Sequence, residues 1–102
     1  MLLITGTIRL GSAEALQRAT AGLAARAARS RQDAGCLDYQ FSVAVDDPSE
    51  IRLVERWASQ EDLDAHLAVP DPEFSALLAE AEITSAVVEL HEVAGSREMM
   101  RR

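Results

Sequence analysis

His66 is the side chain best suited to move a proton, because imidazole gains and loses its charge near neutral pH. It shares an apolar helical face with Leu63 and Leu67, in a segment that directly follows a predicted strand. The same placement suits a half-buried histidine that only ties a helix to a sheet. The sequence therefore leaves two interpretations of His66 open, a general base or a structural residue.

Glu55 and Trp57 are expected on the inward face of that strand, which runs from about residue 51 to residue 58. A buried acid normally needs a partner, and the candidates are His66, Tyr39 and the arginines of the first helix. Alternatively, Glu55 lies at the strand margin and pairs with an arginine in water. A buried indole N–H also needs an acceptor, so Trp57 is either a core residue or a polar handle in a pocket.

Other kinds of chemistry have little support in the sequence. Cys36 is the only cysteine, which excludes an intrachain disulfide and cysteine-based zinc or iron–sulfur sites. We interpret it as a small buried apolar residue rather than a nucleophile. No histidine and carboxylate share the helical spacing of a metal site, and the glycine-rich phosphate loop and the G-x-S-x-G motif are both missing. We therefore expect no metal.

The charge of the chain limits its partners. The net charge is −7 and the pI is about 4.7, so neither nucleic acid nor an anionic membrane is expected as a partner. The basic run Arg26, Arg29 and Arg31 is interpreted as the solvated face of a helix. No apolar run approaches the ~20 residues of a membrane span. The N-terminus lacks the basic start and cleavage site of a secretion signal, so a cytoplasmic location is expected.

Hydrophobic periodicity predicts the elements that position these residues. Ser12, Ser59 and Asp71 are expected helix N-caps, Gly35 is expected to end the first helix, and Pro70 interrupts the second helical segment. Alternating residues predict strands. The predicted elements are a strand at 2–10, a helix from residue 12 towards residue 35, a strand at 37–45, a turn at 46–49, a strand at about 51–58, two short helices around residue 70, and a strand at about 83–93.

This β-α-β-β-α-β order predicts a ferredoxin-like α+β domain, with a four-stranded antiparallel sheet and helices on one face. The domain is expected to span residues 1–95 and to be followed by a basic C-terminal tail at residues 96–102. The opposite face of the sheet is mixed in character. The residues alone leave open whether that face meets solvent or a second subunit.

Three short motifs carry a resemblance to a known family. They are Gly35-Cys36-Leu37-Asp38-Tyr39, then Glu55-Arg56-Trp57-Ala58-Ser59, then Leu63 and His66. Together they resemble the antibiotic biosynthesis monooxygenase family of the dimeric α+β barrel superfamily, over about residues 2–94. The resemblance implies a homodimer in which two sheets pack into a barrel, and a pocket between the helices and the sheet of each subunit. Some members oxidise aromatic polyketides or hydroquinones with O₂ and without metal, flavin or haem.

Residue by residue, the resemblance implies roles for the candidate site. His66 would be the base or phenolate partner, Trp57 and Tyr39 would orient the substrate, and Glu55 would fix His66 or a structural arginine. Haem-degrading relatives use an asparagine in the first strand, and this chain contains no asparagine, so haem degradation is not expected. The implied pocket is lined by Tyr39, Glu55, Trp57, His66, Phe74 and Leu78.

The function expected from this resemblance is cofactor-independent monooxygenation of a small phenol, hydroquinone or polyketide-like molecule. The enzyme would hold the phenol, promote its deprotonation and exclude water. One alternative is a non-catalytic small-molecule-binding or stress-associated protein. Another is an isomerase or lyase of the same superfamily, which needs a proton shuttle and no O₂. All of these place a small aromatic or apolar molecule in the pocket.

Overall fold

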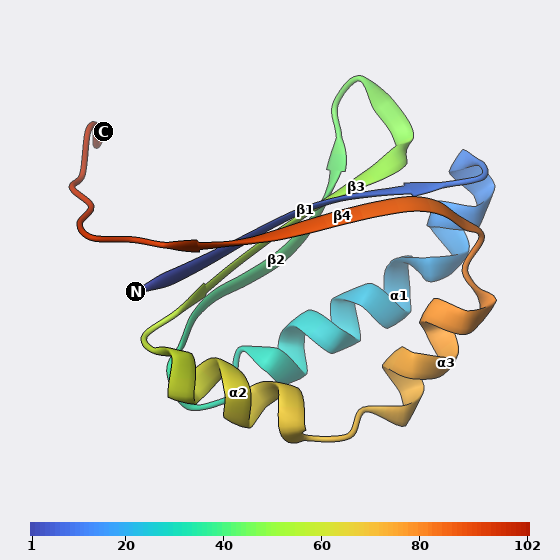
Figure 1. The fold of residues 1–102 in the computed structure, drawn as a ribbon. Helices are drawn as coiled ribbons and strands as arrows, with labels where there is room; N and C mark the ends of the chain where they lie inside the picture. Colours follow the sequence, from blue (N-terminus) through green and yellow to red (C-terminus); the bar gives the residue numbers. More distant parts are fainter.

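A computed structural model describes residues 1–102 as a curved sheet with a layer of helices on one side (Figure 1). The chain order confirms the predicted succession of elements, with the second helical segment divided near Pro70. The elements are β1 (Leu2–Leu10), α1 (Ala13–Ser30), β2 (Cys36–Ala44), β3 (Asp47–Trp57), α2 (Gln60–Ala68), α3 (Pro72–Glu80) and β4 (Ile83–Glu92).

The sheet has the order β2-β3-β1-β4, and every neighbouring pair is antiparallel. Ile4 in β1 lies opposite Glu55 of β3 on one side and Leu90 of β4 on the other. Tyr39 of β2 also lies opposite Glu55, so Glu55 has Ile4 on one neighbouring strand and Tyr39 on the other. The predicted ferredoxin-like fold is therefore confirmed.

The three predicted N-caps begin the three helices. Ser12 accepts a hydrogen bond from the backbone N–H of Ala15 at 3.0 Å, and Ser59 accepts one from Asp62 at 3.2 Å. Asp71 accepts one from Phe74 at 3.1 Å. Each cap satisfies a donor that the first helical turn leaves free, which is why the sequence located these starts.

The first helix ends earlier than the sequence predicts. It stops at Ser30, and tight turns follow in which Gln32 and Asp33 donate backbone bonds to the last helical turn. Gly35, expected to end the helix, instead ends the connection to β2, with φ of 78°. A Cβ at this position would overlap the Asp62 carboxyl group, so glycine is required there.

The β2–β3 hairpin turn is shorter than predicted. It occupies residues 45–46, β3 begins at Asp47, and Pro48 lies inside the strand. The register is irregular beyond the Val43–Ile51 pair. Pro48 falls in this irregularity, where its missing N–H removes no regular ladder bond.

The core lies between the sheet and α1. Small side chains on α1, including Ala15, Ala19 and Ala27, are almost fully buried and let the helix lie close to the strands. One cluster joins Ala27 to residues from three strands and α2, and a second joins the first half of α1 to Leu10 and Ile51. Phe41 contacts both clusters.

The helices leave β4 uncovered. α1 packs against β1, β2 and β3, and every residue of β4 is exposed. Val87 lies opposite Thr7 on the helix-free face and is 62% exposed, whereas Val88 and Leu90 point to the helix side and are 54% and 46% exposed. The strand therefore presents apolar side chains on both faces of an open sheet edge.

Candidate active site

Four of the six predicted site residues lie together in the core. Tyr39 and Glu55 face each other across β2 and β3, and Trp57 follows Glu55 on the same face. Helix α2 adds His66, whose ring centre lies 4.5 Å from that of Trp57 and 5.9 Å from that of Tyr39. All four are buried, and Trp57 is completely buried. This buried cluster of Tyr39, Glu55, Trp57 and His66 is close-packed.

Glu55 is bonded to Trp57 within this cluster. The indole N–H of Trp57 donates to Glu55 Oε1 at 2.9 Å, whereas the sequence suggested His66, Tyr39 or an arginine of the first helix as the partner of this acid. Burial raises the pKa of the Glu55 carboxyl group, against the lowering effect of the Trp57 bond and of the charges on His66 and Arg26. Glu55 therefore holds the indole ring in place and takes up a proton more readily than an exposed glutamate.

His66 has both ring nitrogens occupied. Nδ1 lies 2.6 Å from Asp33 Oδ2, and Nε2 lies 3.1 Å from a terminal nitrogen of Arg26. A guanidinium group only donates, so Nε2 must accept and the neutral ring carries its proton on Nδ1, which donates to Asp33. This tautomer makes Nε2 the basic atom, and Arg26 currently occupies it.

Arg26 links the buried cluster to α3. Its Nη1 donates to Asp71 Oδ2 at 3.0 Å, and its guanidinium carbon lies 4.7 Å from the centre of the Phe74 ring. Arg29 also bonds both oxygens of Asp71. The bond from Arg29, followed by those from Phe74 and Arg26, lowers the pKa of Asp71 to about 2. Phe74 thus borders the cluster through Arg26.

Leu78 lies apart from the buried cluster. It is 41% exposed, and its side chain lines a small apolar hollow of about 30 Å³ between α1, α3 and the sheet. Phe74 lines the same hollow and lies 6.3 Å from Phe41 between ring centres. The structure therefore brings Tyr39, Glu55, Trp57 and His66 together, with Phe74 beside them and Leu78 further along α3.

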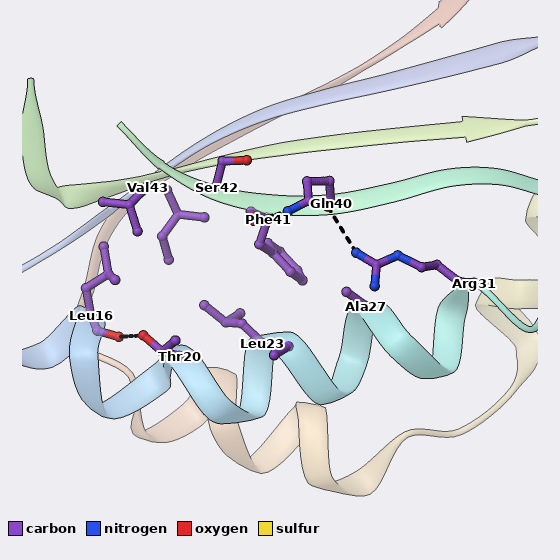
Figure 2. A pocket seen from close by; sticks show the side chains of 11 residues that line it. Leu16, Thr20, Leu23, Ala27, Arg31, Gln40, Phe41, Ser42 and Val43 are labelled. Carbon is purple, nitrogen blue, oxygen red and sulfur yellow. Dashed lines mark hydrogen bonds between the residues drawn. The ribbon is translucent and has the colours of Figure 1, made fainter. Parts of the chain in front are cut away.

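An open groove lies beside the cluster, between α1 and the edge strand β2 (Figure 2). Its volume is about 180 Å³, and seven of its eleven lining residues are hydrophobic. Ala27 and Phe41 line this α1–β2 groove and also pack in the core cluster that contains Tyr39 and Trp57. The remaining lining residues are Leu16, Thr20, Leu23, Ala24, Arg31, Gln40, Ser42, Val43 and Ile51.

Two components of the site were not found from the sequence. Asp33 lies in the turn after α1, and its bond to His66 spans 33 residues of chain. Arg26 was considered as part of a basic run and as one of several possible partners of Glu55, and its bond to His66 spans 40 residues. Neither residue differs in type or spacing from ordinary surface charges on a helix and its end, so the sequence carries no signal for these contacts.

Neither a reactive thiol nor a metal centre is found beside the cluster. Cys36 is half-buried, and burial raises the pKa of its thiol, which disfavours the thiolate. No group of three or more histidine, cysteine or acidic side chains is placed to hold a metal ion. None of the three helices has the length and apolar character needed to cross a membrane.

Comparison with known proteins identifies a matching family and several structures with the same fold. A model of the antibiotic biosynthesis monooxygenase family matches residues 1–79. A candidate antibiotic biosynthesis monooxygenase from Deinococcus radiodurans is 26% identical, with a TM-score of 0.87 over 99% of this chain and 100% of that chain. A Pseudomonas aeruginosa protein is 28% identical, with a TM-score of 0.72 over 92% and 94% of the two chains.

A more distant structure shares the fold. It is a variant of SnoaB, a cofactor-independent oxygenase from Streptomyces nogalater, which is 15% identical with a TM-score of 0.70 over 93% of this chain and 94% of that chain. No curated protein matches the sequence.

Proposed function

The chain belongs to the antibiotic biosynthesis monooxygenase family, and from this membership we propose that it is a cofactor-independent monooxygenase-type enzyme. Its substrate is a small aromatic molecule, such as a phenol or hydroquinone, that reacts with O₂. In this proposal the deprotonated substrate itself gives an electron to O₂. The protein contributes binding, deprotonation and exclusion of water.

The α1–β2 groove is the observation that carries this proposal. An apolar protein cavity of about 150 Å³ holds benzene, so a groove of about 180 Å³ accommodates one substituted ring. Its apolar walls, which include Leu23 and Phe41, fit a ring face. Phe41 also packs against the cluster that holds Tyr39 and Trp57, so this side chain lies between a bound ring and that cluster. His66 itself opens to a separate polar hollow that Arg26 and Asp33 also line.

His66 is the proposed base in this scheme. Asp33 fixes the tautomer in which Nε2 accepts protons, as an orienting acid does in hydrolytic triads. Arg26 occupies Nε2, so proton transfer requires the guanidinium to leave that nitrogen when substrate binds. Asp71 offers Arg26 an alternative partner that is already in contact with it.

The experiment is oxygen uptake with a panel of hydroquinones, anthrones and related phenols. We expect uptake above the rate of autoxidation, falling by a factor of about 100 in His66→Ala and in His66→Gln, because a lost acid–base group has that scale. Glutamine keeps a hydrogen-bonding side chain, which separates lost chemistry from lost packing. Gln17→Ala is the control, since Gln17 is exposed on α1.

A non-catalytic small-molecule-binding protein is the second candidate function. It is favoured by the saturated hydrogen bonding and deep burial of His66. Binding of the same compounds without oxygen uptake, or uptake that is indifferent to His66, would support this candidate and return His66 to a structural role.

We also propose that the protein is a homodimer. Val87, Val88 and Leu90 give β4 exposed apolar side chains on both faces, and Leu3 and Val54 are only half-buried on the helix-free face beside it. A second copy packed on this surface would remove these side chains from water.

A further inference from the structure

The α1–β2 groove carries a positive charge in a chain whose net charge is −7. Arg31 is the only charged residue among those that line it, and the lining includes no acid. Arg31 extends from the end of α1 to one end of the groove, beyond Leu23 and Phe41 (Figure 2). The apolar lining of the groove and its single cation therefore lie side by side.

Arg31 differs from the other arginines of the folded domain. Across residues 1–92, each of the others has a carboxylate within 4.0 Å, whereas Arg31 has none. Among the arginines of residues 1–92, Arg31 is therefore the one with which an external anion can pair without displacing an acid of the chain.

The guanidinium of Arg31 is also held in position. Its Nε donates to the backbone carbonyl of Tyr39 at 2.9 Å, and its Nη2 donates to Gln40 Oε1 at 3.0 Å. A guanidinium has five N–H donors, so both on Nη1 and one on Nη2 remain free. Fixing the group in advance reduces the ordering that binding must supply.

Of the other three polar side chains of the groove, Thr20 and Gln40 are already hydrogen-bonded, and Ser42 is a neutral hydroxyl that adds no charge. The hydroxyl of Thr20 donates to the Leu16 carbonyl inside α1. Gln40 accepts from Arg31 and donates its amide to the Phe41 carbonyl. Arg31 is thus the charged donor with free N–H groups at the end of the groove.

We propose that the α1–β2 groove selects aromatic molecules that carry a carboxylate, with Arg31 as the specificity-determining residue. The ring lies against Leu23, Phe41 and Val43, and the carboxylate accepts hydrogen bonds from the free edge of Arg31. This inference rests on the proposed function, because it names the substrate class of the same groove.

The test uses 2,5-dihydroxybenzoate and its neutral analogue, 2,5-dihydroxybenzamide. The two have the same ring and the same hydroquinone hydroxyl groups, and they differ at the group meant for Arg31, which is a carboxylate in the first and a neutral amide in the second. Binding is followed by titration with backbone amide NMR, which gives the dissociation constant and the location together. The variants are Arg31→Gln and, as a matched control on the same helix, Arg18→Gln, because Arg18 is exposed and pairs with Glu82.

We expect the wild type to bind the benzoate about ten-fold or more tightly than the benzamide, on the scale of hydrogen bonds to a charged group. Arg31→Gln should remove this preference by weakening binding of the benzoate alone, and Arg18→Gln should keep the preference. The largest shifts should fall on Leu23, Phe41 and Val43. Equal affinities, a preference that survives in Arg31→Gln, shifts elsewhere or no binding at all would each overturn the inference.

Oxygen uptake on the same samples separates this inference from the proposed function. Carboxylate-selective binding that depends on Arg31, with no uptake, would support the groove assignment and contradict the monooxygenase. Uptake that is equal for both compounds and unchanged in Arg31→Gln would support the monooxygenase and contradict the role of Arg31.

Discussion

Glu55 shows how the core holds a polar group without losing its packing. It lies opposite Tyr39 on the neighbouring strand, and the indole of Trp57 donates to one of its oxygens. Such a group is costly to bury when charged, which is the reason for its raised pKa. Two consequences can be measured, one for the acid and one for the indole.

The Glu55→Gln variant should be more stable than the wild type at neutral and higher pH. Between the ordinary pKa of a glutamate and the raised value, the native state binds more protons than the unfolded state, so the free energy of unfolding of the wild type falls as pH rises. Glutamine keeps the acceptor for Trp57 and does not titrate. Urea unfolding from about pH 4 upward should show this decline only in the wild type. A parallel decline in the variant would contradict the assignment of the buried charge to Glu55.

The Trp57→Phe variant should lose the donor to Glu55 while keeping an aromatic ring. An unsatisfied buried acceptor costs about 1–3 kcal/mol, in addition to any loss of packing. Combining Trp57→Phe with Glu55→Leu removes both polar groups, and the pair should then show a clear coupling energy in urea unfolding. Additive losses would mean that the bond contributes nothing to stability.

At the scale of elements, one acid joins three of them. Asp71 begins α3 as its N-cap and also receives bonds from Arg26 and Arg29 of α1, while Arg26 reaches His66 of α2. The helix layer is therefore held together by charge-assisted bonds near the break at Pro70. A change at this joint affects how the helices pack more than whether each helix forms.

The Asp71→Asn variant tests this joint, because asparagine remains a good N-cap but carries no charge. The pKa of Asp71 is lowered to about 2, so its stabilising effect is present above the ordinary carboxyl range and is lost as pH falls through about 2. The wild type should be more stable than the variant at neutral pH, and the difference should shrink as pH approaches 2. Asp71→Ala, which also loses the cap, should be the less stable of the two variants. A wild-type advantage that does not change with pH would contradict the ion-pair explanation.

The elements show what the sequence could and could not predict. Strand periodicity and the caps at Ser12, Ser59 and Asp71 are local signals, and they located the sheet and the helix starts. The end of α1 was misplaced at Gly35, because the early stop at Ser30 depends on turns that bring Asp33 to His66. That contact is tertiary, so the local sequence around residue 30 does not predict it.

The candidate site, too, could be predicted only in part from the sequence. Tyr39, Glu55 and Trp57 could be grouped because two adjacent strands and the inward face follow from alternation. Leu78 was assigned to the pocket from the family resemblance, yet α3 places it at a separate small hollow, where it is 41% exposed. The α1–β2 groove was not foreseen, since it depends on where α1 crosses the edge of the sheet.

At the scale of the whole molecule, the exposed β4 strand decides the expected assembly. A chain of 102 residues buries a small core, and an open apolar edge adds surface that a partner can cover. Light scattering at micromolar concentration should give twice the mass of one chain. Val87→Lys places a charge on the helix-free face beside Thr7 and should shift the mass towards a monomer, whereas Ala28→Lys on exposed α1 should not. A monomeric wild type would contradict the proposed dimer.

Because Trp57 is the only tryptophan, the protein contains its own optical reporter at the centre of the candidate site. The indole is shielded from water and its ring lies 4.5 Å from that of His66. Emission from a shielded indole is shifted to the blue. The fluorescence of the unlabelled protein therefore reports on the contact between the indole and the His66 ring. A ligand that draws Arg26 away from the ring would be seen as a change in brightness, before any product is formed.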